Sequence, residues 1–253
     1  MTSQIVAFAD LDDTVFQTLR KLPGADSARL TPATVNTAGE PHSFMTPAQT
    51  ALLDLLAAGN VTVIPVTGRD PAAFARVGLE FPSWRVLDHG LTILDAAGEP
   101  EQTWATRVRA ELEPLQAELG RLTDWLRPQA AQAGARLTVH HAHDLPFMTV
   151  LKHPEASAEI LADLQDAWTA ALPAEAGLTV IANANNVSLL PAGLGKAAAV
   201  RYLRQTYFPQ AALTLGLGDS VSDLGFMAEC DFALTPTAGQ LMRTLRSVTL
   251  PQR

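Results

Sequence analysis

Carboxylates gather at two places in the sequence, each directly after an apolar run. Residues 10–14, DLDDT, follow IVAFA, and residues 218–223, GDSVSD, follow LTLGL. Carboxylates this close repel one another unless a cation lies between them, and Mg²⁺ prefers oxygen ligands of this kind. Open α/β sheets bind ligands at the carboxyl ends of their strands, so the two clusters are expected side by side. Acids after a strand are explained about as well as turn formers or helix caps, so neither cluster is decisive alone.

Two further segments offer what a phosphate group needs. Thr67, Gly68 and Arg69 end the apolar run VTVIPV, where a hydroxyl and backbone N–H groups can hold a phosphate oxygen. Lys196 opens the helical stretch KAAAVRYL, and a cation at a helix N-terminus is mildly unfavourable unless it has a partner. Taken singly, each residue is more often an ordinary cap or an exposed side chain.

Short apolar runs alternate with helical patterns over most of the chain, which predicts an α/β fold with a doubly wound, Rossmann-like parallel sheet. Residues 5–10 and 61–66 read as strands. Thr46, Pro47 and Gln49 give the capping box and first-turn proline of a helix that stops at Gly59. The irregular stretch from about Leu22 to Met45 is expected to form a hairpin turning at residues 38–41, and it stays open whether this hairpin is a flap over the site.

An inserted domain is expected after a strand at WRVLD and a small hairpin at residues 91–100. A long helical region from about Thr103 to Ala133 begins it. Strands at residues 135–141, 146–153 and 178–183 and a helix over residues 155–172 continue it, which is an α+β pattern of its own. We therefore expect a core formed by residues 1–98 and 187–253, and an inserted α+β cap domain over residues 99–186.

In order and spacing, the chemical segments resemble the four motifs of the haloacid dehalogenase (HAD) superfamily. Asp10-x-Asp12-x-Thr14, Thr67, Lys196 and Gly218-Asp219-x-x-x-Asp223 carry this resemblance. The insert between the second and third motifs is similar to the larger α/β cap of the Cof-type and sucrose-phosphate-phosphatase-like branch, and DHGLTILDAAGEP resembles a hairpin of that branch. The commoner pattern there has Gly in place of Asp13 and Asn in place of Ser222, which predicts altered detail near the site.

The resemblance implies a phosphatase in which Asp10 attacks phosphorus and Asp12 serves as acid and then as base. It implies Mg²⁺ held by Asp10, the backbone carbonyl of Asp12 and Asp219, with Asp223 as a further ligand or an anchor. Mn²⁺ or Co²⁺ could replace Mg²⁺ at such ligands. The phosphate contacts that it implies are Thr67, Gly68 and Lys196.

The predicted substrate is a small phosphorylated metabolite, with sugar phosphates as the first choice because of the resemblance. Arg69, Asn183, Asn185 and Asn186 are the candidate specificity residues, although the asparagines are equally well explained as turn formers. Two alternatives stay open: a sugar phosphomutase, and a binding protein without catalysis on the same fold. The second is disfavoured because every motif keeps its carboxylates and its lysine.

Composition narrows the remaining classes. A formal net charge of −8 argues against non-specific binding of nucleic acid or an anionic membrane. No signal peptide and no apolar run of spanning length is apparent, so a cytoplasmic protein, a monomer or small homo-oligomer, is expected. The single cysteine, Cys230, lies in an apolar context that predicts a buried, unreactive thiol.

Three patterns resemble functional motifs but are interpreted as having no such function. GLGKAA lacks the first glycine and the Ser or Thr of a P-loop. A metal site at His140, His141, His143 and Asp144 is disfavoured because strand alternation splits neighbours between two faces. Trp104, Trp125 and Trp168 are expected to pack the core of the insert rather than to stack on a sugar.

Overall fold

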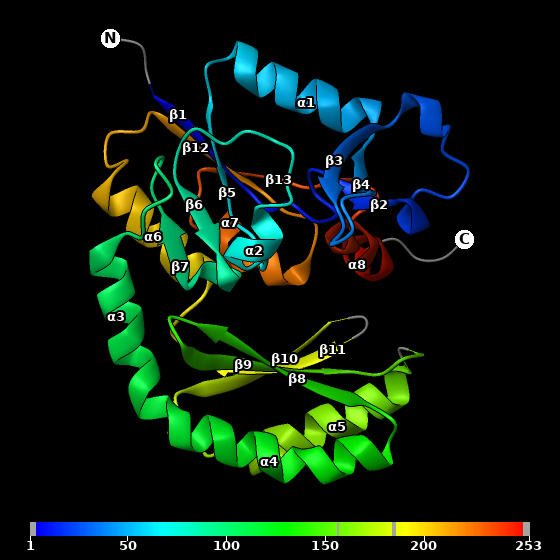
Figure 1. Ribbon diagram of the computed structural model, residues 1–253, viewed down its shortest axis with the longest axis vertical. Helices are drawn as coiled ribbons and strands as arrows, with labels where there is room; N and C mark the ends of the chain where they lie inside the picture. The colour runs from blue at the N-terminus through cyan, green and yellow to red at the C-terminus, as the bar shows by residue number, and fades with distance from the viewer. Residues whose placement is uncertain (1–3, 156, 184–185, 250–253) are drawn as a thin grey trace. The chain divides into compact units, whose positions relative to one another are not determined.

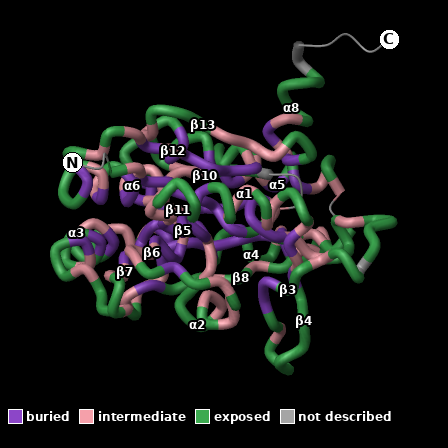
Figure 2. Tube along the Cα trace, turned by 90° about the horizontal axis from the view of Figure 1, so that it is seen from above, coloured by how far each residue is buried: buried purple, intermediate pink, exposed green. Residues whose placement is uncertain are grey.

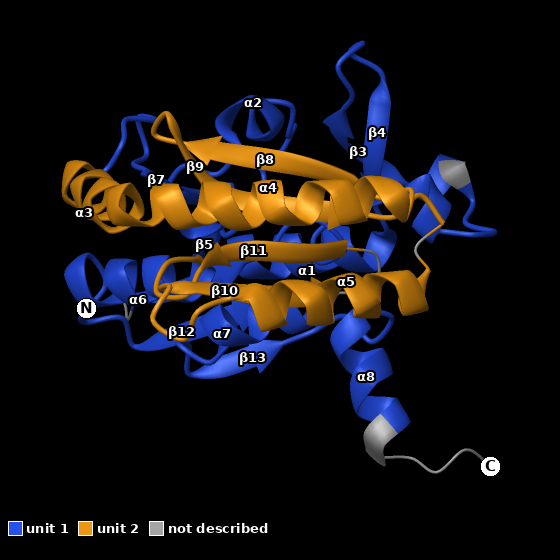
Figure 3. Cartoon of the chain, turned by 90° about the horizontal axis from the view of Figure 1, so that it is seen from below, with its two compact units in different colours: residues 1–101, 196–253 blue, residues 102–195 orange. Residues whose placement is uncertain are grey.

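The computed structural model describes residues 4–155, 157–183 and 186–249 (Figure 1). The chain forms two compact units, shown in different colours in Figure 3. Unit 1 comprises residues 1–101 and 196–253, and unit 2 comprises residues 102–195. The chain thus returns to unit 1 at Lys196, later than the expected return at Val187.

Unit 1 is built on a parallel four-stranded sheet in the order β13-β12-β1-β5. Helix α1 lies on one face of this sheet and α6 and α7 lie on the other (Figure 1). The predicted α/β fold with a parallel core sheet is therefore confirmed. The elements of this layer are β1 Ile5–Ala9, α1 Pro47–Ala58, β5 Thr62–Pro65, α2 Pro71–Phe74, α6 Lys196–Thr206, β12 Leu213–Leu217, α7 Leu224–Met227, β13 Phe232–Leu234 and α8 Gln240–Thr249.

Strand β1 is apolar without alternation because both of its faces are covered. Residues 6–9 have no exposed surface, and the buried segments in Figure 2 follow the strands of the sheet. Helix α1 begins as predicted, with a capping box in which Thr46 accepts from the N–H of Gln49 while the Gln49 side chain accepts from the N–H of Thr46. The amide nitrogen of the Gln49 side chain also donates to the carbonyl of Thr14 over 3.0 Å, which ties the helix start to the DLDDT segment.

Two hairpins complete unit 1. The predicted hairpin within residues 22–45 is present, and its turn places Gly39 at a φ of 81°. The other expected hairpin, at residues 91–100, is also present but short: Leu94 bridges Pro100, and the N–H of Asp95 donates to the carbonyl of Glu99 over 2.9 Å. Residues 92–94 also pair with the strand before them. The bounds are β2 Gln17–Thr18, β3 Thr31–Val35, β4 Pro41–Met45, β6 Arg85–Leu87 and β7 Thr92–Leu94, with 3₁₀ turns at Leu19–Lys21, Ser27–Arg29, Asp88–Gly90 and Val221–Asp223.

Unit 2 is an antiparallel sheet in the order β10-β11-β9-β8 that packs against α4 and α5. Strand β11 belongs to this sheet, so the expectation that residues from 187 onward rejoin the core is wrong for this strand. The expected long helix is broken by a 3₁₀ turn at Glu113–Leu115, where Pro114 supplies no N–H. The bounds are α3 Gln102–Leu112, α4 Gln116–Gln132, β8 Arg136–Ala142, β9 Leu145–Lys152, α5 Ala158–Ala171, β10 Leu178–Asn183 and β11 Asn186–Pro191.

The tryptophans of unit 2 follow the packing prediction in two cases of three. Trp104 and Trp168 are fully buried, and the indole N–H of Trp168 donates to the carbonyl of Leu122 over 3.1 Å. Trp125 is 39% exposed, so the prediction that it packs the core is wrong: its place on α4 faces away from the sheet.

His143 and Asp144 form the two-residue turn between β8 and β9, both at positive φ. The one potential metal-binding group found among the described residues does not include them.

The sequence predicts no membrane-spanning segment and a buried, unreactive cysteine. Within the described residues, no helix combines the length and the hydrophobicity needed to cross a bilayer. Cys230 is half-buried, and burial raises the pKa of its thiol to about 12, with a smaller opposing effect from Arg204. The thiol is therefore protonated at neutral pH, as its apolar context predicts.

Candidate active site

Three strand ends converge at one edge of the parallel sheet. Residue 9 of β1 lies level with Leu217 of β12 and with Pro65 of β5. The chain leaves these strands at Asp10, Gly218 and Val66, and the N–H of Asp10 donates to the carbonyl of Leu217 over 2.8 Å. The acidic segments and the Thr67 segment therefore start from neighbouring positions, which is the arrangement that a parallel sheet predicts.

Lys196 connects two of the acidic strand ends. Its ammonium nitrogen lies 2.7 Å from Oδ1 of Asp10 and 2.7 Å from Oδ1 of Asp223. All three side chains are nearly buried, and the ammonium also lies 5.6 Å from the centre of the Phe226 ring. The other oxygen of Asp10 accepts from the hydroxyl of Thr14 over 3.0 Å. Both oxygens of Asp10 are thus oriented by donors.

The electrostatics of this group follow from burial. Burial raises the pKa of Asp10, the Lys196 ammonium opposes this effect, and the charge of Asp223 adds to it. Burial alone would lower the pKa of Lys196, but the charges and hydrogen bonds of Asp10 and Asp223 together raise the pKa above its ordinary value. Lys196 is accordingly a permanent cation between two carboxylates.

Asp223 holds the turn after β12. Its Oδ2 accepts from the N–H of Asp219 at 3.2 Å, the N–H of Ser220 at 3.1 Å and the hydroxyl of Ser220 at 2.7 Å, while Oδ1 accepts from Lys196. Gly218 is required here because a Cβ at this position would lie 2.5 Å from the Cβ of Asp223. The side chain of Asp223 therefore folds back and accepts hydrogen bonds from the turn to which it belongs.

Asp10, Asp219 and Asp223 form a group of three carboxylates with one ligand oxygen each, all within 4.8 Å of one another. Burial, followed by the charges of Asp223 and Asp13, raises the pKa of Asp219 to about 6, and the N–H of Gln240 opposes the shift. Three carboxylates outnumber the single ammonium of Lys196, so the group has an excess of negative charge. An all-oxygen set with this charge fits a hard divalent cation such as Mg²⁺.

The Thr67 segment forms a tight turn beside the sheet. Thr67 is buried, its N–H donates to the carbonyl of Val86, and its hydroxyl accepts from the N–H of Arg69 over 3.2 Å. A Cβ on Gly68 would lie 2.4 Å from the His89 ring, so only glycine fits without a shift of that ring. Close backbone approach of this kind is what a phosphate-binding turn uses.

Asp12 is paired with Arg69. The guanidinium donates from Nε to Oδ2 of Asp12 over 2.8 Å and from a terminal nitrogen to Oδ1 over 2.7 Å. The carboxylate of Asp12 is half-exposed, in contrast to that of Asp10. Sequence reasoning placed Arg69 among the substrate contacts and did not anticipate this pair, because nothing in either segment alone selects the other as its partner.

The two departures from the commoner motif have local explanations. Asp13 adopts a φ of 69°, a left-handed conformation that favours glycine and that Asp tolerates better than most residues, and its carboxylate pairs with Lys21. Ser222 hydrogen-bonds the hydroxyl of Ser220 over 2.8 Å. Thr14 belongs to the first motif, and its hydroxyl contacts Asp10. It was not predicted as a site residue from the sequence.

The predicted asparagines lie in unit 2, at the end of the β10–β11 hairpin. The backbone of Asn183 pairs with that of Asn186, whose side-chain oxygen accepts from the Ser188 hydroxyl at 3.5 Å. Asn185 lies outside the described residues. Their contribution to substrate binding stays a prediction.

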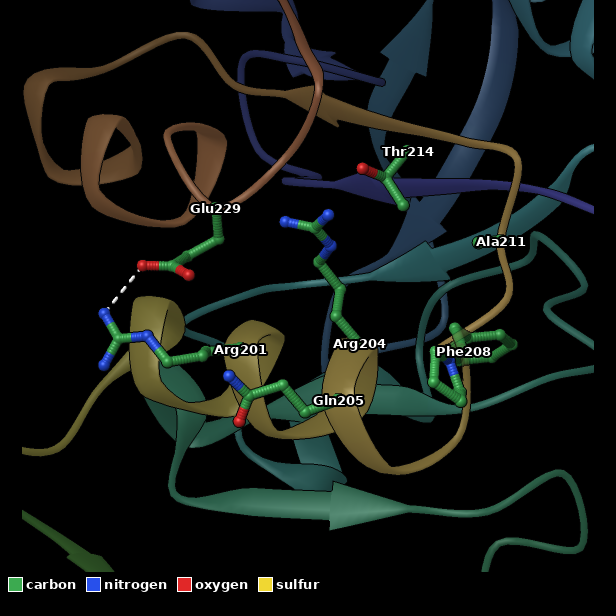
Figure 4. Close-up of a pocket in the computed structure, with 8 residues that line it drawn as sticks. Arg201, Arg204, Gln205, Phe208, Ala211, Thr214 and Glu229 are labelled. Carbon is green, nitrogen blue, oxygen red and sulfur yellow. Dashed lines mark hydrogen bonds and ion pairs between the residues drawn. The ribbon is translucent and has the colours of Figure 1, made fainter.

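A surface cavity of about 400 Å³ lies beside α6, away from the motif residues (Figure 4). Arg201 and Arg204 line it, and Arg201 is already paired with Glu229 over 2.6 Å. Since its lining includes no residue of the four motifs, we do not assign it to the candidate active site.

The geometry of the site agrees with the comparison to known families. The sequence model of the sucrose-6F-phosphate phosphohydrolase family matches residues 41–233, well over half of the chain. The chain belongs to this family. It is accordingly a phosphoric monoester hydrolase of the HAD type, as the motifs predict. No curated protein sequence matches the chain.

The chain shares its fold with several HAD phosphatases of known structure. The sucrose-phosphatase from Synechocystis sp. PCC6803, solved with sucrose and phosphate, is 19% identical with a TM-score of 0.58, over 100% of this chain and 90% of that chain. The C-terminal domain of Candida albicans (C. albicans) trehalose-6-phosphate phosphatase is 13% identical with a TM-score of 0.61, over 99% and 79%. A haloacid dehalogenase-like hydrolase from B. subtilis is 15% identical with a TM-score of 0.52, over 98% and 93%.

Proposed function

We propose that the protein hydrolyses a small sugar phosphate through an aspartyl-phosphate on Asp10. The observation that carries this proposal is the placement of Lys196, whose ammonium lies 2.7 Å from the Asp10 carboxylate at the end of β1. The family name and the sucrose and phosphate bound to the Synechocystis protein support a sugar phosphate as the substrate class.

In the first half-reaction, an oxygen of Asp10 forms a bond to phosphorus as the bond between phosphorus and the sugar oxygen breaks. Asp12 gives its proton to the departing oxygen, so the sugar leaves as an alcohol. Thr14 and Lys196 orient the two oxygens of Asp10 during the attack. To carry this proton, one oxygen of Asp12 leaves the guanidinium of Arg69, while the other oxygen keeps its hydrogen bond to it.

In the second half-reaction, water attacks phosphorus and the bond to Asp10 breaks, which releases inorganic phosphate. Asp12 now accepts a proton from that water and returns to its starting form. One carboxylate therefore acts as nucleophile and its neighbour two residues later as acid and base, so each has a separate role.

Asp10, the backbone carbonyl of Asp12 and Asp219 are the residues that would hold a magnesium ion. When bound, Mg²⁺ would neutralise the charge between an anionic nucleophile and an anionic phosphate. The carboxylate of Asp223 already accepts from Lys196 and from three donors of its own turn, which favours the anchoring role over direct coordination.

Thr67, Gly68 and Lys196 are the proposed phosphate contacts. The hydroxyl of Thr67 and the backbone at Gly68 would donate to the phosphoryl oxygens, and Lys196 would balance their charge. Unit 2 is the proposed source of contacts to the sugar, in the role of a cap domain.

Phosphate release tests this proposal directly. Wild type would be assayed with Mg²⁺ and with EDTA on p-nitrophenyl phosphate, sucrose 6F-phosphate, trehalose 6-phosphate and glucose 6-phosphate. Asp10→Asn is expected to lower kcat by about 10³-fold or more, because it removes the nucleophile and keeps its shape. Asp54→Asn, an exposed aspartate of α1, is the matched control and should leave the rate unchanged. A fully active Asp10→Asn variant would refute the mechanism, and turnover of a sugar phosphate without phosphate release would indicate a mutase.

A further inference from the structure

We propose that Arg69 is a positioning residue that fixes the direction of the Asp12 carboxylate, rather than a residue that selects the sugar. This inference rests on the proposed function, because it assigns a role within that reaction. It begins from the two parallel hydrogen bonds, 2.8 and 2.7 Å long, through which the guanidinium of Arg69 holds both oxygens of Asp12. A bidentate pair fixes the plane of a carboxylate as well as its distance.

Arg69 is the anchored member of this pair. Its third guanidinium nitrogen donates to the carbonyl of Ala73 over 3.3 Å, and the central carbon lies 5.2 Å from the ring centre of the fully buried Phe16. Its backbone is held too, since the carbonyl of Arg69 accepts from the N–H of Asp88 over 2.9 Å. The side chain of Arg69 is 16% exposed, against 50% for Asp12. The arginine is therefore a fixed support, and the carboxylate is the group that needs one.

The backbone around Asp12 is held without fixing its side chain. Residue 12 bridges to Phe16, and the N–H of Asp13 donates to the carbonyl of Phe16 over 2.7 Å. These contacts close the loop after β1. Within the described part of the chain, the two hydrogen bonds from Arg69 are those that reach the Asp12 carboxylate. Removing them frees rotation about the side chain of Asp12 while the loop stays closed.

The same contacts limit what else Arg69 can do. Its Nε–H and one N–H of a terminal nitrogen face Asp12, and one N–H of the other terminal nitrogen faces Ala73, so three of its five N–H groups are directed at protein acceptors. A residue that selected among sugars would need donors directed at the substrate. Most of the donors of Arg69 are directed at Asp12 and at Ala73 of α2, which favours support of the acid-base group over selection of the sugar.

This role predicts a dependence on the leaving group. A sugar alkoxide is a poor leaving group and needs the proton of Asp12, whereas 2,4-dinitrophenolate leaves without one. Loss of the Arg69 support is expected to lower kcat/KM for sucrose 6F-phosphate by about 10²-fold, the scale of a misplaced catalytic group. For 2,4-dinitrophenyl phosphate, kcat/KM is expected to stay within about threefold, because this parameter reports on the steps up to the first bond cleavage.

The experiment is a double-mutant cycle with Arg69→Met, Asp12→Asn and the combined variant, each assayed on both substrates with saturating Mg²⁺. If Arg69 acts through Asp12, Arg69→Met has no further effect once Asp12 is replaced. Arg69→Lys should resemble Arg69→Met, because an ammonium keeps the charge but lacks the two parallel N–H donors of a guanidinium. Arg76→Met is the matched control, since Arg76 donates to the Ala72 carbonyl over 2.9 Å in the same segment and pairs with no carboxylate among the described residues.

Several results would overturn the proposal. Additive losses in the double variant, or an equal loss on both substrates with a raised KM, would make Arg69 a direct substrate contact. Full recovery by lysine would show that charge alone matters, and an Arg69→Met variant with wild-type kcat/KM on the sugar phosphate would leave Arg69 without a role. If wild type releases phosphate from neither substrate, the proposed function itself fails, which is a different result from an active wild type with additive variants.

Discussion

Lys196 donates to Asp10 over 2.7 Å although the two residues are 186 positions apart in the chain. Lys196 is the first residue of α6 and also the first residue after unit 2. The chain therefore inserts a whole unit between two side chains that touch. The contact depends on the core sheet of unit 1, which brings the start of α6 to the carboxyl end of β1.

Replacing Lys196 by methionine should lower activity and stability together. The proposed loss of a charge facing the phosphoryl group predicts a decrease in kcat of about 10²- to 10³-fold. Removing one partner of a buried ion pair costs about 3–5 kcal/mol, because Asp10 and Asp223 would face each other without a cation. Phosphate release and urea unfolding measure the two effects. Lys152→Met, an exposed lysine at the end of β9, is the control and should change neither.

Magnesium should stabilise the folded protein by binding between Asp10, Asp219 and the backbone carbonyl of Asp12. A ligand present at 100 times its Kd adds about 2.7 kcal/mol to the free energy of unfolding. We expect Mg²⁺ to raise the unfolding midpoint of wild type and to have little effect on Asp219→Asn, which loses one charged ligand of the group. Asp54→Asn should respond like wild type. Equal stabilisation of Asp219→Asn and wild type by Mg²⁺ would place the ion elsewhere.

Gly68→Ala should disturb the predicted phosphate turn by crowding. The added Cβ would lie 2.4 Å from the His89 ring, which has to move or push the turn away from Thr67. Overpacking of this kind costs about 1–3 kcal/mol, and displacement of the turn should raise KM for phosphorylated substrates. Gly120→Ala is the contrasting control: no heavy atom lies within 4 Å of the added carbon, and a helical glycine replaced by alanine should gain about 0.5–1 kcal/mol. A Gly68→Ala variant as stable and as active as wild type would contradict the crowding argument.

The features predicted well from the sequence are those that depend on neighbouring residues or on the sheet rule. Thr46 and Gln49 lie three positions apart, so the capping box of α1 could be predicted from local sequence alone. The meeting of Asp10 with the GDSVSD segment needed one further rule, that parallel strands end at a common edge. Both predictions involve few alternatives, which is why they could be made before the fold was known.

The features that were missed depend on choices among several equivalent partners. The sequence holds many carboxylates that could pair with Arg69, and the pair with Asp12, 57 positions away, goes together with the packing of Phe16 against the guanidinium. Strand β11 is apolar enough for either sheet, and it joins unit 2 because it forms a short hairpin with β10. Trp125 lies on the outer side of α4, off the row of buried leucines at 119, 122 and 126, so helical periodicity separates it from the buried Trp104 and Trp168.

Acid should weaken the junction between β12 and β13 through Asp231. Oδ2 of Asp231 accepts from the hydroxyl of Thr214 over 2.7 Å and from its N–H over 2.8 Å, while the N–H of Asp231 donates back to the Thr214 hydroxyl over 3.0 Å. The hydroxyl of Thr214, followed by its N–H, lowers the pKa of Asp231 in the folded protein. A lowered folded pKa contributes stability that is present above the unfolded pKa, near 3.9, and is lost as the pH falls through the folded pKa.

The decrease in unfolding free energy between pH 7 and pH 3 should therefore be smaller for Asp231→Asn than for wild type. The difference is expected to be below about 1 kcal/mol, because the Asp231 side chain is 47% exposed and its charge is screened. Urea unfolding at the two pH values measures it, with Asp54→Asn as the control, because the acidic cluster at the active site titrates equally in all three proteins. An equal decrease in wild type and Asp231→Asn would show that the Thr214 donors do not favour the ionised carboxylate. A larger decrease in the variant would reverse the sign of the linkage, which the contacts of Asp231 with Thr214 exclude.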